Sequence, residues 1–388
     1  MGASPPDEPY SVRDFKAEFG GNLGVKWLTK ATSKKNKRYK NRMIPRLNIS
    51  FPLENQKQFW FGKAYSSQAG EYLLNHARSG IVMALRTTLP HGGKVGVVAY
   101  NCHTVANAVV QSGCTPVFVD VTNDLHVDVQ QLAGLELDAL VLTNLFGIRN
   151  SIAEVRNVVG DLPIIVDNAH GYGLPLEGDF TVYSINQGKF PALGEGGILY
   201  VNNPAYAEPI QTQYACLKGY TTIQELKLYA TMLLKALMHT PWIYQTITLR
   251  IKKNRQTAAC HSEVVLKRMA TGVSRMYQQT LTTIPQEIVL QQHNAQTTAE
   301  YLLNQNMAQH TWYGENAFML IAQTEKPKVL KNHLLQRGIE TATHFSHAID
   351  WAQEFGYTKG SCPTAEQLTK KLLMIPTYCQ KASLKIKV

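Results

Sequence analysis

Short apolar runs alternate with amphipathic stretches from about residue 67 onward. The amphipathic stretches have the spacing typical of helices and cover Gln68–Leu89, Thr104–Ser112 and Ile152–Val159. The apolar runs have the length of buried strands and cover Val95–Ala99, Pro116–Asp120, Asp138–Thr143, Pro163–Asp167, Thr181–Ile185 and Gly197–Val201. This alternation predicts an α/β fold with a mostly parallel central sheet and helices on both faces.

The pattern also predicts how the chain is divided. Residues 1–60 contain prolines, glycines and many charges, which is typical of an irregular basic arm. A large domain is expected over 61–262. A smaller C-terminal α/β domain is expected over 263–388, with helical spacing to Gln305, a strand-like run at Ala317–Ala322 and a helix-like run at Lys328–Arg337.

A helical insertion is predicted within the large domain, at about residues 213–262. Its central part, Ile223–Arg250, is rich in leucine, methionine, tyrosine and tryptophan. Lys235, His239 and Pro241 fall in the middle of this part, which argues against a transmembrane helix. Two interpretations remain open, a buried helical pair or a hairpin that lies in a membrane interface.

The net charge of +11 is unevenly distributed, because nine basic residues and no acidic residue lie between Lys26 and Arg46. Such a run is either a solvated arm or a contact for an anionic membrane surface or a phosphate-rich substrate. Nucleic acid is not expected, since the run has no zinc-finger or RNP motif. The six cysteines form no CxxC pair and the N-terminus has no apolar run. We therefore expect no metal site and a cytoplasmic protein, with the inner face of the membrane as its one candidate contact.

Two charged residues fall where predicted strands end, and ligands of parallel sheets bind at that edge. Asp167 closes the run Pro163–Asp167, and the alternative role for it is a helix N-cap. Lys189 follows the run Thr181–Ile185 and precedes the glycine-rich turn Gly194–Gly197. A lysine in a loop is usually solvated, but one that is enclosed between strands has the lowered pKa that Schiff-base chemistry needs.

A third element is the pair Ser79 and Gly80. A small polar residue and a glycine that open a helix offer free backbone N–H groups to a phosphate, although an ordinary helix start has the same appearance. Pyridoxal 5'-phosphate (PLP) needs a lysine, an acidic partner for its ring nitrogen and a cradle for its phosphate. The chain supplies all three, so we predict that it holds this cofactor.

The stretch from about Ser79 to Val201 resembles the DegT/StrS family of sugar aminotransferases, which belong to fold type I of the PLP-dependent transferases. The motifs that carry the resemblance are Ser79-Gly80, Ala106-Asn107-Ala108, Gly113–Asp120, Asn144–Gly147, Asp167-x-Ala169-His170, Ser184 five residues before Lys189, Gly194–Gly197, Pro363–Glu366 and Ile375-Pro376.

The resemblance implies a role for each matched residue. Lys189 would carry the cofactor and move the proton, Asp167 would hold the ring nitrogen, and His170 would contact the ring. Ser79, Gly80 and Ser184 would bind the phosphate. Cys102 stands where the family has an aromatic residue over the ring, which leaves His103 and Tyr100 as alternative covers. The family's Gly-Tyr-Asn-x-Arg segment is not recognisable, and Gly219-Tyr220-Thr221 is a poor match.

The resemblance further implies a homodimeric enzyme of glycan or secondary-metabolite biosynthesis. It would transfer an amino group from an amino acid, glutamate in the family, to a keto-sugar that is nucleotide-linked. One alternative is a PLP-dependent sugar dehydratase, in which a histidine replaces the lysine. The other is a non-catalytic or regulatory protein on an aminotransferase scaffold. The presence of both Asp167 and Lys189 favours the aminotransferase.

Overall fold

A computed structural model describes residues 44–47, 49–244, 261–343 and 345–378 of the chain. Residues from Met43 onward form one compact unit. The basic run apart from Arg46 lies outside the described residues, as do the four cations at 250–255 that follow the helical insertion.

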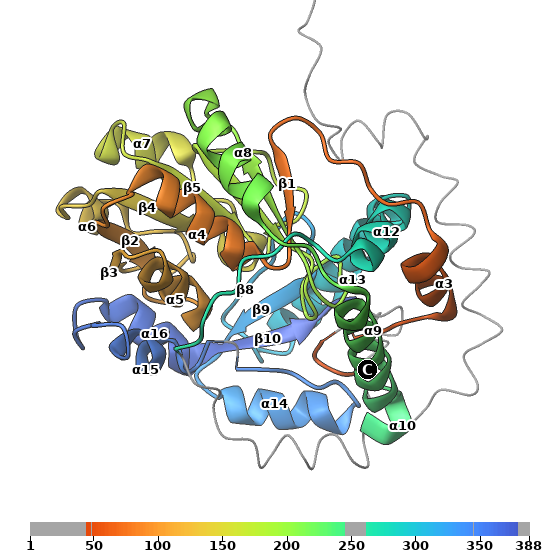
Figure 1. The fold of residues 1–388 in the computed structure, drawn as a ribbon. Coiled ribbons are helices and arrows are strands. Elements are labelled where there is room, and N and C mark those ends of the chain that lie inside the picture. The colour runs from red at the N-terminus through yellow and green to blue at the C-terminus, as the bar shows by residue number, and fades with distance from the viewer. Residues whose placement is uncertain (1–43, 48, 245–260, 344, 379–388) are drawn as a thin grey trace, which may run out of the picture. The chain divides into compact units, whose positions relative to one another are not determined.

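The central feature is a seven-stranded sheet with the strand order β1-β7-β6-β5-β4-β2-β3 (Figure 1). Its strands are β1 (Glu71–Leu74), β2 (Lys94–Val98), β3 (Thr115–Val119), β4 (Ala139–Thr143), β5 (Ile164–Asn168), β6 (Phe180–Ser184) and β7 (Gly197–Val201). Strands β3, β2, β4, β5 and β6 run parallel to their neighbours, whereas β7 pairs antiparallel with β6 and with β1. The predicted, mostly parallel sheet is therefore confirmed.

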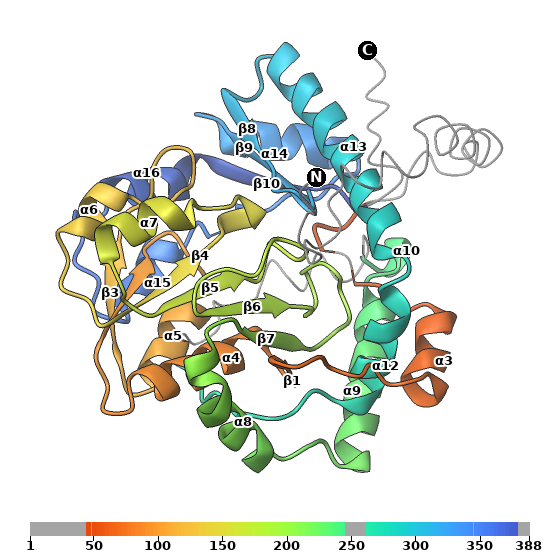
Figure 2. The ribbon, with the colours of Figure 1, turned by 90° about the horizontal axis from the view of Figure 1, so that it is seen from above.

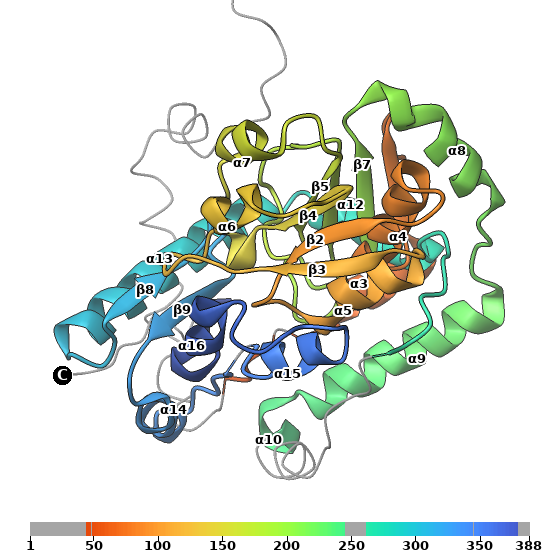
Figure 3. The same ribbon diagram turned by 90° about the vertical axis from the view of Figure 1, so that its left-hand side faces the viewer.

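Alternate residues of the strands pack on opposite faces of this sheet, as the pleat requires. Leu140, Leu142 and Val166 belong to a core that contains Leu132 and Val155, which are residues of α6 (Val129–Ala133) and α7 (Ile152–Val159). Their strand neighbours belong to a second core on the other face, with α4 (Ala77–Thr88), α5 (His103–Gln111) and α8 (Ala207–Cys216). Figure 3 shows α7 and α5 on the two sides of the strands.

A smaller antiparallel sheet has the order β10-β9-β8, from β8 (His310–Trp312), β9 (Met319–Gln323) and β10 (Leu372–Pro376). Helices α13 (Ile284–Asn304) and α14 (Pro327–Gln336) cover it through a core of their own. Helices α15 (Ala348–Gln353) and α16 (Pro363–Lys371) pack towards the large sheet instead. The buried carboxylate of Asp120 accepts from the backbone N–H groups of Thr364 and Ala365, at 2.9 and 2.8 Å, and so joins the end of β3 to the start of α16.

Three stretches differ from the sequence expectation. The predicted helix Gln68–Leu89 is the edge strand β1 followed by α4, because four consecutive side chains of Glu71–Leu74 are buried against β7. Residues 263–270 are not helical; this extended segment precedes α12 (Thr271–Thr280). The expected arm contains α3 (Leu53–Phe61), whose Phe59 is completely buried, so residues 53–61 are part of the packed protein.

The helical insertion consists of α8, α9 (Thr222–Met238) and the short α10 (Pro241–Ile243). One face of α9 packs on a core shared with α3 and α12 (Figure 2), where Tyr229 contacts the rings of Phe51, Phe59 and Trp60. Met232 is the one residue of α9 that is buried, and residues 245–260 of the predicted insertion lie outside the described residues. Among the helices that the structure describes, none has the length and apolar character to cross a membrane.

The remaining short elements are the 3-10 helices Leu145–Gly147 after β4 and Pro204–Tyr206 after β7.

Candidate active site

The carboxyl ends of the parallel strands bring the predicted residues together. Thr143 is the last residue of β4 and Ser184 is the last residue of β6. Asp167 is the second-last residue of β5 and is the partner of Thr143 in the sheet. A chain of side-chain hydrogen bonds fixes the aspartate, since Asn101 Nδ2 donates to Thr143 Oγ1 at 2.9 Å and Thr143 Oγ1 donates to Asp167 Oδ2 at 3.4 Å. The second oxygen of Asp167 accepts from the N–H of Ala169 at 3.0 Å. No helix begins at Asp167, so the N-cap interpretation is wrong.

Lys189 lies in the turn between β6 and β7, with its ammonium group enclosed by the protein. Burial lowers the pKa of Lys189, and the nearby charges of Cys102 and Asp167 oppose that shift. Gly188 has a φ of +76° and lies against Leu47, where a Cβ would come within 2.9 Å of a leucine methyl group. A glycine is therefore required beside the lysine, which is itself half-buried.

Asp167 and Lys189 influence each other's charge. Burial raises the pKa of Asp167, while the Ala169 N–H, the charge of Lys189 and the Thr143 hydroxyl act in the opposite direction. An aspartate in this position gains most from a cation that is placed directly against it, because an opposite charge favours the ionised carboxylate. A protonated ring nitrogen is a cation of this kind.

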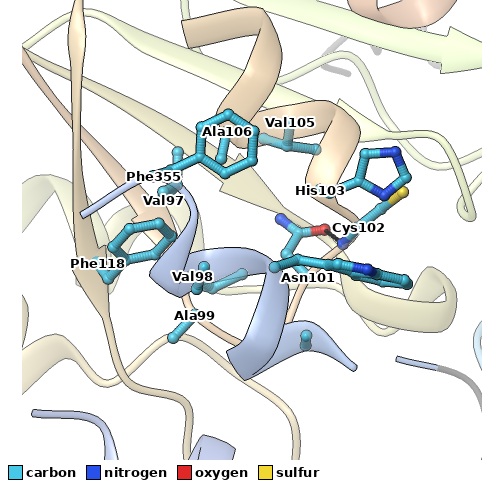
Figure 4. Close-up of a pocket in the computed structure, with 13 residues that line it drawn as sticks. Val97, Val98, Ala99, Asn101, Cys102, His103, Val105, Ala106, Phe118 and Phe355 are labelled. Atoms are coloured by element: carbon cyan, nitrogen blue, oxygen red, sulfur yellow. Dashed lines mark hydrogen bonds between the residues drawn. The ribbon is translucent and has the colours of Figure 1, made fainter. Parts of the chain in front are cut away.

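Cys102 lies at the end of the segment that follows β2, immediately before α5. Burial alone would raise the pKa of its thiol, but hydrogen bonds from His103 and Thr104 and the charge of Lys189 together lower that pKa to about 7. Figure 4 shows Cys102 and His103 side by side, away from Phe118 and Phe355, in the set of residues that lines a pocket between α5 and α15.

Tyr100 and His103 were the alternative covers for the cofactor ring. Tyr100 is fully buried against the rings of Phe146 and Phe345, whereas His103 is half-buried and contacts Trp351. The buried Nδ1 atom of His103 has no hydrogen-bond partner. His103 and Cys102 therefore remain as the groups at this strand end that can face a ligand.

Ser79 and Gly80 are the third and fourth residues of α4 and so lie within its first turn. The helix opens at Ala77, and the N–H of Ser79 already donates to the carbonyl of His76 at 3.1 Å. The Ser79 hydroxyl is fully buried and donates to Asn75 Oδ1 at 2.8 Å. Gly80 packs against the sheet, where a Cβ would meet a Val182 methyl group at 2.9 Å. Their side chains therefore serve the packing of α4.

The first turn of α4 also contains groups for an anion cradle that the sequence analysis did not single out. Gly197 approaches this turn so closely that a Cβ would lie 2.2 Å from the Ala77 nitrogen. Arg78 is largely buried there, and its Nε atom has no hydrogen-bond partner. Burial and repulsion from Arg78 lower the pKa of His76 to about 4, against the opposing effect of a hydrogen bond with Asn186, so its ring is neutral at pH 7. Arg78 stands next to Ser79 in the sequence, but the misplaced helix start concealed its position.

His170 is enclosed by aromatic rings. Its ring stacks on Phe146 and Phe345, with centroids 5.6 and 5.8 Å apart, and its Nδ1 atom accepts from the N–H of Phe146 at 3.2 Å. The N–H of Phe146 is thus a fixed donor, so any proton on the imidazole must be on Nε2. The stacked rings and this hydrogen bond fix the orientation of the imidazole.

The turn Gly194–Gly197 is contacted by a residue that the sequence marked as a poor match. The hydroxyl of Tyr220 donates to the carboxylate of Glu195, and the ammonium of Lys267 lies 4.9 Å from the centre of the Tyr220 ring. Burial raises the pKa of Glu195, against the opposing charges of Arg78, Lys267 and Lys235. Tyr220 therefore connects the helical insertion to the loop that carries Lys189.

In the described parts of the chain, no cluster of His, Cys, Asp and Glu has the grouping that holds a metal ion. The donor set is organic: a buried lysine, a buried carboxylate, a thiol of lowered pKa and a helix start with a buried guanidinium.

A parallel sheet with an enclosed lysine and a buried aspartate at neighbouring strand ends is the fold type I architecture that the resemblance implied. The chain belongs to the DegT/DnrJ/EryC1/StrS aminotransferase family, whose model matches residues 73–386. The predicted family and enzyme class are thus confirmed.

Three relatives illustrate the range of this similarity. An uncharacterized protein of Methanocaldococcus jannaschii is 21% identical over 364 residues, which are 87% of this chain and 89% of that protein. A putative sugar aminotransferase of Streptococcus pneumoniae, solved in its PMP form, has 14% identity and a TM-score of 0.67, with 89% of this chain and 96% of that chain covered. A GDP-4-keto-6-deoxy-D-mannose-3-dehydratase of E. coli with bound hydrated PLP has 18% identity and a TM-score of 0.58, with coverage of 84% and 86%.

Proposed function

We propose that this protein is a PLP-dependent aminotransferase that delivers an amino group to a keto-sugar. The observation that carries the proposal is the pairing of two buried, oppositely charged groups, Lys189 and Asp167, at neighbouring strand ends. Family membership and the solved relatives that contain PLP or PMP support it. When bound, PLP supplies an electron sink for the carbon that loses a proton.

Each residue of the site has a part in this function. Lys189 would bind the cofactor through Nζ and then move a proton, since burial lowers the pKa of its amine. Asp167 would hold the ring nitrogen protonated. The first turn of α4, with Arg78, would bind the phosphate, and Ser184 at the end of β6 lies at the same edge of the sheet. Cys102, His103 and His170 would position the ring.

The substrates belong to the same proposal. Relatives that are described as sugar aminotransferases support a keto-sugar acceptor, and one solved relative was crystallised with its TDP-sugar product. We infer a nucleotide-linked acceptor, with glutamate as amino donor, and a homodimer as the working form. Glycan or secondary-metabolite biosynthesis is the setting that this chemistry fits.

The test is the visible absorption spectrum of the purified protein with added PLP, followed by borohydride reduction and peptide mapping. A yellow band and a label on Lys189 are expected, together with bleaching by glutamate and loss of the label in K189A. A protein that takes up no PLP would refute the proposal in favour of a non-catalytic scaffold. Cofactor uptake with water loss from a keto-sugar, and no amino transfer, would establish the dehydratase instead.

We also propose that this cytoplasmic enzyme contacts the membrane surface through α9. Opposite its packed face, α9 carries exposed apolar residues at helical spacing, which together with Trp242 are named the outer face: Ile223, Leu226, Leu233, Leu234, Leu237 and Trp242. Every charged residue from Leu226 to Ser262 is basic. A symmetric pairing with a second copy would bring like charges together, whereas an anionic lipid surface complements them.

Flotation with vesicles that contain phosphatidylserine at low salt tests this contact. We expect the protein to float with these vesicles, less with neutral phosphatidylcholine vesicles, and to lose flotation in the L234D/L237D variant. The exposed pair Val265 and Val329, changed to aspartate, is the matched control. A wild-type protein that stays unbound, or a variant that changes the oligomeric state and not flotation, would refute membrane contact.

A further inference from the structure

A small cavity lies beside Lys189 on the side of the smaller sheet. Its volume is about 20 Å³, enough for a water-sized group. The residues that line it are Arg46, Leu47, Gly188, Lys189, Phe190, Gln291, Phe318, Met319, Met374 and Tyr378. Its walls are thus mostly apolar. Two of its polar side chains, Arg46 and Gln291, each have a buried polar atom without a hydrogen-bond partner, and such atoms are costly in apolar surroundings.

Arg46 is held in place by its own backbone. Its N–H donates to Glu340 at 2.8 Å, and the preceding residues form a parallel bridge between Ile44 and Ile339. The Tyr378 hydroxyl donates to the carbonyl of Pro45 at 2.7 Å. The guanidinium takes part in no ion pair among the described residues, and its buried Nε atom has no hydrogen-bond partner. A fixed cation with an unused donor is therefore part of the cavity.

Gln291 comes from α13 and is 3% exposed. Its carboxamide oxygen has no hydrogen-bond partner in the structure. A buried acceptor without a hydrogen bond costs about 1–3 kcal/mol, so an oxygen that is satisfied by a ligand is the economical explanation. Because oxygen and nitrogen of an amide exchange places by a half-turn, Gln291 can offer either an acceptor or an N–H₂ donor to that ligand.

We propose that Arg46 and Gln291 form the binding site for the α-carboxylate of the amino donor. The inference rests on the proposed function, in which the donor nitrogen must reach the cofactor at Lys189. In an α-amino acid the carboxylate is bonded to the same carbon as the nitrogen, so it must lie close to Lys189, which lines this cavity together with Arg46 and Gln291. A phosphate of a nucleotide-linked sugar is separated from the keto carbon by the sugar ring. The planar guanidinium matches a carboxylate with two parallel hydrogen bonds.

The experiment uses two reagents that differ in the carboxylate alone. Aminooxyacetate and O-methylhydroxylamine both react with enzyme-bound PLP, which changes its absorbance, and only the first carries a carboxylate. The rate constants of both are measured on the PLP-loaded full-length protein. We expect R46Q to lower the rate constant of the reaction with aminooxyacetate by about 10- to 100-fold, as the loss of a charge-assisted hydrogen bond predicts. The rate constant for O-methylhydroxylamine and the affinity for PLP should be unchanged.

Three further variants make the result interpretable. R46K should recover part of the rate with aminooxyacetate that R46Q loses. Q291L should lower the wild-type rate with aminooxyacetate by a smaller factor than R46Q does. Q291L thus tests the inference even if R46Q does not fold. R337Q, at an exposed arginine after α14, should behave as the wild type. Equal rates for wild type and R46Q with aminooxyacetate would overturn the inference.

The remaining outcomes are equally decisive. One such outcome is that inorganic phosphate slows the reactions of both reagents in the wild type and in R337Q, but not in R46Q. In that case the site binds the phosphate of the acceptor and the inference is wrong. A wild-type protein without any PLP absorbance would overturn the proposed function, and the inference with it. A normal PLP spectrum with an unchanged ratio of the two rates would overturn the inference alone.

Discussion

Gly197 offers a quantitative test of how the phosphate cradle is built. A Cβ at this position would lie 2.2 Å from the Ala77 nitrogen and from the His76 carbonyl carbon, whereas ordinary contact begins at 3.4 Å. The strand and the helix start would have to separate by more than an ångström in G197A. Gly197 is fixed in the sheet between Leu74 and Ser184, so neither side yields easily. We expect G197A to lower the free energy of unfolding by about 3 kcal/mol, the upper end of the usual cost of overpacking.

The same displacement moves the free N–H groups at the start of α4, so PLP should bind at least about tenfold more weakly, which corresponds to ~1.4 kcal/mol. Urea unfolding gives the first quantity and a PLP titration followed by absorbance gives the second. The matched control is G219A, where a Cβ has no neighbour within 4 Å and φ is not in the left-handed region. The reasoning is refuted if G197A unfolds and binds PLP as G219A does.

Two further predictions concern buried groups around the site. D120A should destabilise the protein by about 2–4 kcal/mol in urea unfolding, because two N–H groups at the start of α16 lose a buried carboxylate. D128A, at a more exposed cap of α6, should cost about 1 kcal/mol, and equal costs would contradict the argument. Alkylation of Cys102 by iodoacetamide, followed by mass spectrometry of its peptide, should be half-maximal near pH 7, since the thiolate forms above its pKa. K189M should shift this midpoint to higher pH because a neighbouring cation is lost, and an unchanged midpoint would show that Lys189 does not act on the thiol.

Local periodicity was sufficient to predict most of the large sheet. The strands from β2 to β7 read as apolar runs because both faces of each are covered by helices. β1 was missed because its four residues join α4 without a proline or glycine between them, and its partner strand β7 is more than a hundred residues away. This error placed the predicted helix start at Gln68, whereas α4 begins at Ala77.

Asp167 and Lys189 could be predicted because a parallel sheet brings its strand ends to one edge, whatever the detailed packing. Arg46 could not. Its position depends on a backbone hydrogen bond to Glu340, 294 residues away, and a run of basic residues gives no sign that its last member is held inside the protein. Gln291 likewise looks like a surface residue of a long helix, although it is buried.

The groups proposed to bind the cofactor and the groups proposed to bind the amino donor come from different parts of the fold, and this division has a functional consequence. Asp167 and the helix start that carries Arg78 belong to the large sheet and its helices, whereas Arg46 and Gln291 belong to the segment and the helix that pack on the smaller sheet. Groups proposed to bind the cofactor are thus built separately from those proposed to select the donor. Free-energy changes from residues without shared partners are additive. We therefore expect the free-energy effects of R46Q and of a change in the cradle to add in the double variant. The effects of changes at Asp167 and Lys189 should not add, because these two groups act on each other's charge.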